Sequence, residues 1–515
     1  ENIGPYFACE VGVRSTGYNP SALPDFHAWL KGRYKDISDL NRQWKATYAR
    51  FEDIQPPQDL CLAGEWKRPH PLGYEFQSWR EDRHVAWLKL IYDAFKKADP
   101  AKPVLADHSG VLRSVDGSRL FDTCDILSVH MRSPHFMLAS IYTYSMNRFA
   151  RKQLGQYECF WGCQEDLPRI AEEKAQRCAM MKYLYRLTIW GRHLQIWWYA
   201  YTSADYLLSY NGNWFNPVYD LTTLRYCAAA LPVGKAKVKR LEDVFLNSSI
   251  APSRVVMIQP NTSMLYQRYA QGESFLEMLE LHELLFARND LYELIPETYF
   301  GDGRAKLDDF DVVILPYALY LPDRLSEQLR GWVEKGGLLI ATGPFGLYDK
   351  SGFDKRDLWA AAFGSDVPTR LTDAKQTDWQ WSVEGKSGDL LEAPLGKGKV
   401  MATLRSLRNR DFKDKAASRL VEALEAKARR AARCASNDFE MTVHEARGGA
   451  RYLCVLNRNV DKAVADTVTL SGEFKRGLDL DAPGGFPLAF KAANGETSFT
   501  LCLEPAEFTL IALEK

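Results

Sequence analysis

The stretch LGQYECFWG (154–162) is apolar and aromatic, as a buried strand is, and yet it contains the carboxylate of Glu158. A charge in such surroundings is costly unless it is paired or has a chemical role. Because Glu158 lies near the end of the predicted strand, it stands where parallel α/β folds carry their functional groups. The stretch therefore predicts a buried strand that ends on a candidate catalytic acid.

Four further segments have the same character. They are PYFACEVG (5–12), PVLADHS (103–109), CDILSVHM (124–131) and HLQIWWYAY (193–201). Between the five strand candidates lie amphipathic stretches with apolar residues every three or four positions, at 26–44, 79–98 and 168–191. Continuous apolar strands that alternate with helices predict a parallel sheet covered on both faces.

All five predicted strands end in polar or aromatic residues, namely Glu10, Asp107 with His108, His130, Glu158, and Trp197 with Trp198. A (β/α)8 barrel builds its site from many strand ends, whereas an open sheet uses one switch point. The pattern thus predicts a (β/α)8 TIM-type barrel in residues 1–235. Since a whole barrel has eight strands, we expect three βα units to be supplied by an upstream segment or a second chain.

Two further domains are expected. A second alternation of strands and helices predicts a doubly wound α/β domain in residues 236–410. Residues 411–515 begin with a charged segment, 414–434, that predicts a linker helix. The remainder alternates apolar and polar residues between glycine and proline turns, which is typical of a small β-sandwich.

Composition excludes several functional classes. Lysine plus arginine equal aspartate plus glutamate at 66 each, so no electrostatic attraction to nucleic acid or to an anionic membrane is expected. No apolar run is long enough to span a bilayer, and we expect a soluble chain, cytoplasmic or periplasmic in a bacterium. No phosphate-binding glycine motif is present, and the scattered cysteines predict buried thiols, with Cys159 and Cys163 only a weak zinc signal. We expect no cofactor and no metal.

Glu10 and Glu158 are the candidate catalytic pair. Retaining glycoside hydrolysis needs two carboxyl groups about 5 Å apart, one that protonates the leaving oxygen and one that attacks the anomeric carbon. Tyr157, or a donor from a neighbouring strand, would keep Glu158 ionised by hydrogen bonding. The alternative is that each glutamate is a structural acid paired with an arginine.

The other strand-end residues are candidate substrate ligands. Asp107 and His108 lack a serine nucleophile in a GxSxG turn, which favours sugar-hydroxyl ligands or supporting residues. His130 is expected to hydrogen-bond substrate rather than metal. Aromatic rings stack against sugar faces, which favours Trp161 and Trp198 as platforms; Trp197 is a further candidate, and the alternative for all three is the core.

The segment FHAWLKGRYKDISDLNRQWKATYARFEDIQPP (26–57) resembles the region that follows the acid/base residue in glycoside hydrolase family 42 β-galactosidases. The pattern is carried by Phe26, Trp29, Leu30, Tyr34, Leu40, Asn41, Trp44, Pro56 and Pro57. The resemblance implies that Glu10 is the acid/base and Glu158 the nucleophile of a retaining exo-β-glycosidase. Residues 310–346 are similar to the trimerisation domain of the family, which implies a homotrimer.

One residue departs from the family pattern. The family has Asn before the acid/base glutamate, where it contacts the sugar 2-hydroxyl, and this chain has Cys9. A β-mannosidase or another β-glycosidase of the same clan is therefore an alternative to a β-galactosidase. A non-catalytic carbohydrate-binding or scaffold subunit is the alternative of another class.

Overall fold

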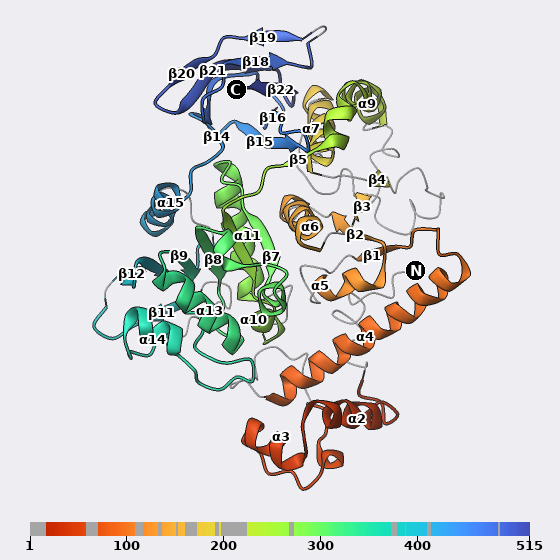
Figure 1. Ribbon diagram of the computed structural model, residues 1–515, viewed down its shortest axis with the longest axis vertical. Coiled ribbons are helices and arrows are strands. Elements are labelled where there is room, and N and C mark those ends of the chain that lie inside the picture. Colours follow the sequence, from red (N-terminus) through yellow and green to blue (C-terminus); the bar gives the residue numbers. More distant parts are fainter. Residues whose placement is uncertain are drawn as a thin grey trace.

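The computed structural model describes residues 17–57, 71–108, 117–131, 136–150, 153–159, 173–190, 195–196, 224–266, 272–371, 379–386, 388–408, 414–482 and 485–515. The described residues form three parts that follow one another along the molecule (Figure 1). A β-sandwich lies at one end, an α/β unit lies in the middle, and the barrel elements run along one side to the helices α2 and α3. None of the helices in these stretches has the length and apolar character that crossing a membrane requires.

The first part contains a four-stranded parallel sheet in the order β1-β2-β3-β4. Its strands are β1 (Leu105–His108), β2 (Ile126–Met131), β3 (Gln153–Cys159) and β4 (Gln195–Ile196). Helices α6 (Phe136–Ala150) and α7 (Glu173–Trp190) separate the last three strands. Four of the five predicted strands are thereby confirmed as neighbours in barrel order, and the fifth candidate, 5–12, lies outside the described residues.

The helices before this sheet differ from the expected single helix over 26–44. The structure has two helices there, α2 (Leu23–Arg33) and α3 (Ile37–Trp44). Tyr34 adopts an extended conformation (φ −114°, ψ 140°), and Asp36 caps α3 by accepting a 2.8 Å hydrogen bond from the Asp39 N–H. A side-chain cap of this kind stabilises a new helix start, and apolar periodicity does not reveal it.

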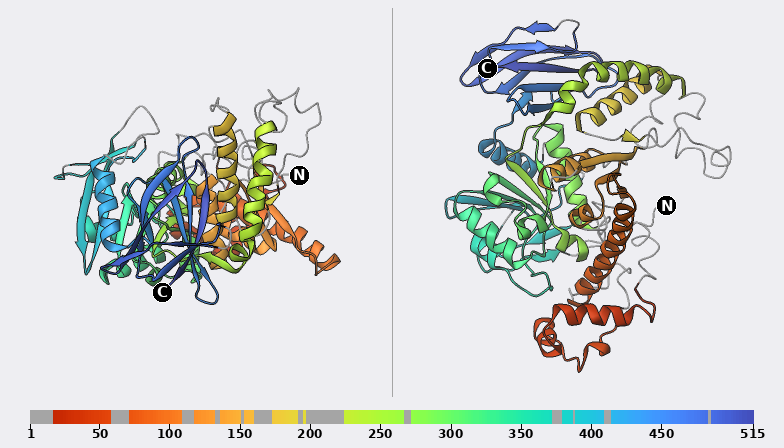
Figure 2. Two further views of the ribbon diagram at one scale, coloured as in Figure 1. Left: turned by 90° about the horizontal axis from the view of Figure 1, so that it is seen from above. Right: turned by 45° about the vertical axis from the view of Figure 1, so that its right-hand side comes forward.

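A short 3-10 turn, η2 (Phe51–Asp53), and the long helix α4 (Pro71–Ala98) follow. Helix α4 begins eight residues before the predicted segment 79–98. Helix α5 (Gly117–Leu120) and the turn η3 (Phe121–Thr123) then connect β1 to β2. The views agree that α4 runs along the outside of the first part, from α2 toward β1 (Figure 2).

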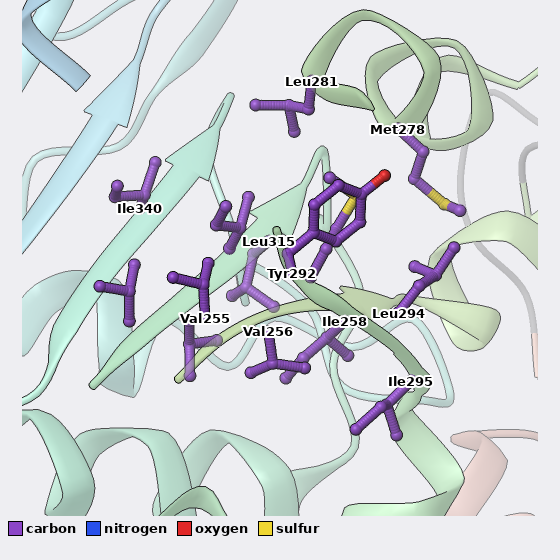
Figure 3. Packing of buried hydrophobic residues seen from close by; sticks show 14 of the residues in the cluster. Val255, Val256, Ile258, Met278, Leu281, Tyr292, Leu294, Ile295, Leu315 and Ile340 are labelled. Atoms are coloured by element: carbon purple, nitrogen blue, oxygen red, sulfur yellow. The ribbon is translucent and has the colours of Figure 1, made fainter. Parts of the chain in front are cut away.

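The second part is a six-stranded sheet in the order β12-β13-β9-β8-β6-β7. Strands β6 (Val255–Gln259), β7 (Glu293–Pro296), β8 (Val312–Pro316), β9 (Leu338–Thr342) and β13 (Gly398–Thr403) are parallel, and β12 (Leu390–Leu395) is antiparallel to β13. The parallel strands have the doubly wound order 2-1-3-4-5. Figure 3 shows that apolar side chains from β6, β7, β8, β9 and helix α11 (Glu273–Ala287) pack together in the core of this part.

Helices α10 (Asn261–Tyr266), α12 (Glu297–Asp302), α13 (Asp323–Glu334) and α14 (Asp357–Phe363) complete this part, with a small ribbon of β10 (Thr369–Leu371) and β11 (Gln380–Ser382). The expected boundary between residues 235 and 236 falls inside helix α9 (Leu224–Asn247). After α9, the short strand β5 (Ser248–Ile250) pairs with the third part and not with the second.

The third part consists of two antiparallel sheets, β14-β17-β21-β20 and β19-β18-β22-β16-β15-β5, as a sandwich requires. The strands are β14 (Ala432–Cys434), β15 (Phe439–Ala446), β16 (Arg451–Asn457), β17 (Val464–Ser471), β18 (Arg476–Asp479), β19 (Phe486–Leu488), β20 (Lys491–Ala493), β21 (Glu496–Leu503) and β22 (Phe508–Glu514). The predicted helix 414–434 is too long, because α15 covers only Lys415–Lys427 and Ala432–Cys434 is a strand. Cys124, Cys178, Cys434 and Cys454 are buried free thiols, as predicted, whereas Cys502 is a free thiol at the surface.

A buried ion pair joins the first part to the third. Arg186 of α7 donates through Nε to the Glu440 carboxylate of β15 over 2.9 Å, and the Trp190 indole N–H donates to the other carboxylate oxygen over 3.2 Å. The Glu440 and Arg186 side chains are only 2% and 10% exposed. The Phe286 ring of α11 lies under the Arg186 guanidinium, 5.6 Å from it. All three parts therefore meet at this pair.

Asn289 and Arg458 extend this junction, which we call the three-part junction. The Asn289 side chain donates to the Phe439 carbonyl and accepts from the Met441 N–H, both over 2.9 Å. Arg458 donates to the Phe286 and Ala287 carbonyls at the end of α11, over 2.5 and 2.6 Å. Carbonyls at a helix C-terminus lack intrahelical partners, so a cation is favourable there.

Removing the Glu440 carboxylate should destabilise the protein strongly. Breaking a buried ion pair from one side costs about 3–5 kcal/mol, because the other charge stays buried. We expect Glu440→Ala to lower the free energy of unfolding by about this amount in urea denaturation. On the same strand, Glu445 pairs with Arg451 over 2.6 Å, but these side chains are 34% and 39% exposed. Glu445→Ala should therefore lower the free energy of unfolding by less than about 1 kcal/mol. If Glu440→Ala and Glu445→Ala lower it equally, the role of Glu440 is contradicted.

Candidate active site at the strand ends

The carboxyl ends of β1, β2 and β3 bring five of the predicted site residues to one edge of the sheet. In the strand register His130 lies opposite Tyr157, and Asp107 and His108 lie opposite Ser128 and Val129. Neighbouring strands are about 4.8 Å apart, so the backbones of these residues lie within roughly two strand spacings. The structure describes their backbone positions, and it confirms that they share the edge where barrel enzymes carry their active sites.

Glu158 occupies an irregular position on this edge. The register between β2 and β3 pairs His130 with Tyr157 and then Met131 with Cys159, so that Glu158 is an extra residue on β3. A bulge of this kind bends the strand locally, and bulges are common beside active sites because they re-aim a side chain. The sequence predicted that Glu158 ends a strand but gave no sign of the bulge.

At the opposite, amino-terminal end of the sheet, a polar side chain stabilises the fold. Asp125, just before β2, accepts hydrogen bonds from the Val104 N–H, from Tyr92 and from Lys96, over 2.8, 2.9 and 3.1 Å. Partial burial raises the pKa of Asp125, but these hydrogen bonds outweigh it and hold the pKa below its usual range. Polar groups at this end of a barrel sheet contribute to stability and not to chemistry.

The remaining predicted site residues, Glu10, Trp161, Trp197 and Trp198, lie outside the described residues. The distance between the Glu10 and Glu158 carboxyl groups therefore remains a prediction, as do the sugar platforms. Among the residues that the structure does describe, no group of three His, Cys, Asp or Glu side chains is arranged to hold a metal ion.

The described residues also enclose a cavity of about 140 Å³, but it lies between the second and third parts. Its lining includes Arg254 with its partner Asp311, the buried Asp290, and the segment 428–432 after α15. None of the predicted site residues contributes to it. The strand-end edge of the first part, and not this cavity, is the candidate site.

The aromatic pattern in residues 26–44 forms a structural core beside the barrel sheet. Phe26, Trp29, Leu30, Tyr34, Leu40 and Trp44 are all at most 9% exposed and pack in one cluster with Phe76 and Trp79 of α4. The Trp29 and Trp79 indoles donate to Asp82 and Asp25, over 2.6 and 2.9 Å, which ties α2 to α4. These aromatic residues therefore hold helices α2, α3 and α4 together as one packed unit.

Tyr34 is the polar centre of this unit. Its hydroxyl donates to Glu75 over 2.7 Å and accepts from the Trp44 indole over 2.8 Å, and Arg33 pairs with the same carboxylate over 3.1 Å. Burial, and then the neighbouring Glu75 carboxylate, raise the pKa of Tyr34 well above its usual range. The sequence identified Tyr34 and Trp44 but missed Glu75, since an acid within an amphipathic helix has no distinguishing spacing.

Comparison with known proteins supports this arrangement. Residues 8–156 match the family model of glycoside hydrolase family 42, described as β-galactosidase. The β-galactosidase LacZ of Heyndrickxia coagulans is 24% identical over 133 residues, which are 25% of this chain and 19% of that protein. The family match thus includes Glu10, the aromatic pattern, β1, β2 and the first part of β3. The match to the curated relative spans about a fifth of that protein's length.

Solved structures extend the likeness to the whole chain at the level of the fold. The β-galactosidase of Bacillus circulans sp. alkalophilus superimposes with a TM-score of 0.71 at 15% identity, covering 96% of this chain and 77% of that one. The β-galactosidase of Rahnella sp. R3 gives 0.67 at 14% identity, with 96% and 76% covered. The family 42 exo-carrageenase of Bacteroides ovatus gives 0.60 at 14% identity, with 96% and 63% covered. These likenesses establish the barrel fold with its two following domains.

The hydroxyl of Tyr34 should contribute measurably to stability. We expect Tyr34→Phe to lower the free energy of unfolding by about 1–3 kcal/mol, because it leaves the buried Trp44 indole without its acceptor and removes one hydrogen bond from Glu75. Tyr48 also contacts Trp44, edge to face, with ring centroids 6.3 Å apart. Tyr48→Phe is the matched control and should change the unfolding free energy by less than about 0.5 kcal/mol. Both variants are measured by thermal and by urea unfolding. If Tyr34→Phe and Tyr48→Phe lower the free energy of unfolding equally, the role of the Tyr34 hydroxyl is contradicted.

Proposed function

We propose that this chain, of which residues 8–156 match the model of glycoside hydrolase family 42, acts as a retaining, exo-acting β-glycosidase on terminal β-galactosides. The observation that carries the proposal is the position of Glu158 in a bulge at the carboxyl edge of a barrel sheet. The family match supports it, because the matched region begins two residues before Glu10 and ends two residues before Glu158.

The proposed reaction is a double displacement. The Glu158 carboxylate attacks the anomeric carbon as Glu10 gives its proton to the glycosidic oxygen, so that the aglycone leaves and a glycosyl ester forms on Glu158. Glu10, now ionised, takes a proton from water, and the water oxygen attacks the anomeric carbon and releases Glu158. The sugar leaves with its original β configuration, and both glutamates return to their starting states.

The neighbouring strand ends supply the proposed substrate contacts. His130 lies beside Tyr157 in the register, and Asp107 and His108 lie on the next strand. We assign these four residues to sugar hydroxyls and to the environment of Glu158. Trp161, Trp197 and Trp198 are proposed as the apolar walls against which the sugar ring stacks.

Cys9 is the observation that favours a second candidate within the same clan. The residue before the acid/base glutamate is expected to contact the sugar 2-hydroxyl, and mannose differs from glucose and galactose at that carbon. Aryl β-galactoside, β-mannoside, β-glucoside and β-fucoside substrates compared at equal concentration would rank these sugars. A higher kcat/KM for the β-mannoside would replace the galactosidase assignment.

Substitution of the two glutamates should separate their roles. Glu158→Gly should lower kcat for an aryl β-galactoside by at least about 10³-fold, and added azide should restore turnover and give the α-glycosyl azide. Glu10→Ala should reduce activity on disaccharides far more than on aryl glycosides with good leaving groups, and azide should give the β-glycosyl azide.

Glu52, which is exposed and paired with Lys31, provides the matched control. Glu52→Gln should leave kcat and KM unchanged. If the Glu158 variant retains full activity, or if the parent chain binds β-galactosides without hydrolysing them, the catalytic proposal fails and a carbohydrate-binding role takes its place.

A homotrimer is the proposed assembly, on the basis of the second part's likeness to the family's trimerisation domain. Light scattering on the purified protein should then give about three times the chain mass of 58.7 kDa. A monomeric mass at micromolar concentration would contradict the proposal.

A further inference from the structure

The cavity between the second and third parts has a mixed lining. Apolar residues of both parts and of the segment that joins them contribute, including Leu291, Leu424, Ala428, Met441 and Val443. Three arginines line it as well, namely Arg254, directly before β6, and Arg429 and Arg430, which follow α15. Figure 1 shows α15 between the α/β part and the sandwich. Small-molecule sites occur preferentially at such domain interfaces, and they combine apolar walls with a few polar groups.

The buried acid in the lining is balanced by cations. Asp290 is only 4% exposed, and it pairs with Arg288 and Arg430 over 3.1 and 3.3 Å. The same two arginines also bind Glu425, so that two cations face two anions. Burial raises the pKa of Asp290 to about 6 despite these arginines, and protonation below that pH removes a negative charge. This side of the cavity therefore carries no excess negative charge.

The exposed side of the cavity carries an unmatched positive charge. Arg254 is neutralised by Asp311, to which it donates over 2.7 and 2.9 Å. The Arg429 side chain is exposed, and it forms no hydrogen bond or ion pair with any residue that the structure describes. Its charge acts on Glu496 at longer range, but that carboxylate already binds Arg433 through both oxygens, over 2.7 Å each. The Arg429 guanidinium is therefore available to an anionic group of a ligand.

We propose that this cavity binds a small organic monocarboxylate, with its apolar body between the two parts and its carboxylate on Arg429. The volume of about 140 Å³ is close to that of an apolar cavity of about 150 Å³ that holds benzene, so a body of about six non-hydrogen atoms fits. The planar guanidinium of arginine matches a carboxylate with two parallel N–H donors.

The site is tied to the stability of the fold and not to the proposed reaction. Asn289 of the three-part junction also lines the cavity, so a ligand there contacts both parts beside the junction. A ligand that binds only the folded state stabilises it by mass action. The proposal does not depend on the roles of Glu10 and Glu158, which lie outside this lining.

Benzoate and benzamide are suitable probes, because they share a benzene ring and differ in charge. Isothermal titration calorimetry on the full chain should show one benzoate site with a Kd of about 0.1–1 mM, as expected for a ligand of this size. Benzamide cannot form the charge-assisted pair with Arg429 and should bind at least about tenfold more weakly. Benzoate should also raise the melting temperature more than an equal concentration of sodium chloride.

Three variants make the test specific. Arg429→Gln should weaken benzoate binding at least about tenfold and leave benzamide binding unchanged. Arg447→Gln is the matched control, because Arg447 is also an exposed arginine without an ion pair among the described residues, and it lies outside the cavity. Ala428→Leu places a larger side chain in the apolar wall and should abolish the binding of both probes, with folding verified by circular dichroism.

Several results overturn the proposal. One is equal affinity for benzoate and benzamide, and another is an equal effect of Arg429→Gln and Arg447→Gln. Both of these hold even if Ala428→Leu fails to fold, because Arg429 and Arg447 are exposed. Undiminished benzoate binding in a folded Ala428→Leu variant places the ligand elsewhere and contradicts the proposal, as does the lack of saturable binding at about 10 mM benzoate.

Discussion

The ion pair between Arg186 and Glu440 is the interaction on which the relative placement of the three parts depends. It joins a barrel helix to the sandwich and lies against Phe286, which belongs to the α/β part. Its two charges are almost fully removed from water, so their energy is favourable only when the partner is present in good geometry. A buried pair of this kind tolerates little displacement between the parts that it joins.

A second contact with the same consequence lies between α6 and β7. Arg148 binds the buried Glu293 carboxylate and donates to the Ile250 carbonyl over 2.7 Å, while Ser145 accepts from the Leu294 N–H over 2.9 Å. Helix α6 follows β2, the strand that carries His130. The edge of the α/β part therefore supports the helix layer behind the candidate site, so that a rigid junction helps to keep the strand ends in place.

The sequence predicted much of the local structure because strands and helices leave periodic patterns. Strands β1, β2 and β3, which contain His108, His130 and Glu158 at or near their carboxyl ends, lie where the apolar runs placed them. The errors have specific causes. Asp36 caps a new helix inside the expected helix 26–44, and the residues after Lys427 extend into strand β14, where Cys434 faces the sandwich core. A cap and a strand added by tertiary pairing have little effect on apolar periodicity.

The sequence by itself determined the order of strands and helices, the strand-end position of Glu158 and the aromatic pattern around Trp44, because these depend on neighbours within a few residues. The tertiary structure decided what depends on distant residues. It showed that β2 pairs with β3 around a bulge at Glu158, that Tyr34 is satisfied by Glu75, and that β5 joins the sandwich. These features join residues between 27 and 198 positions apart in the chain, and no local pattern of charge or hydrophobicity encodes such a pairing.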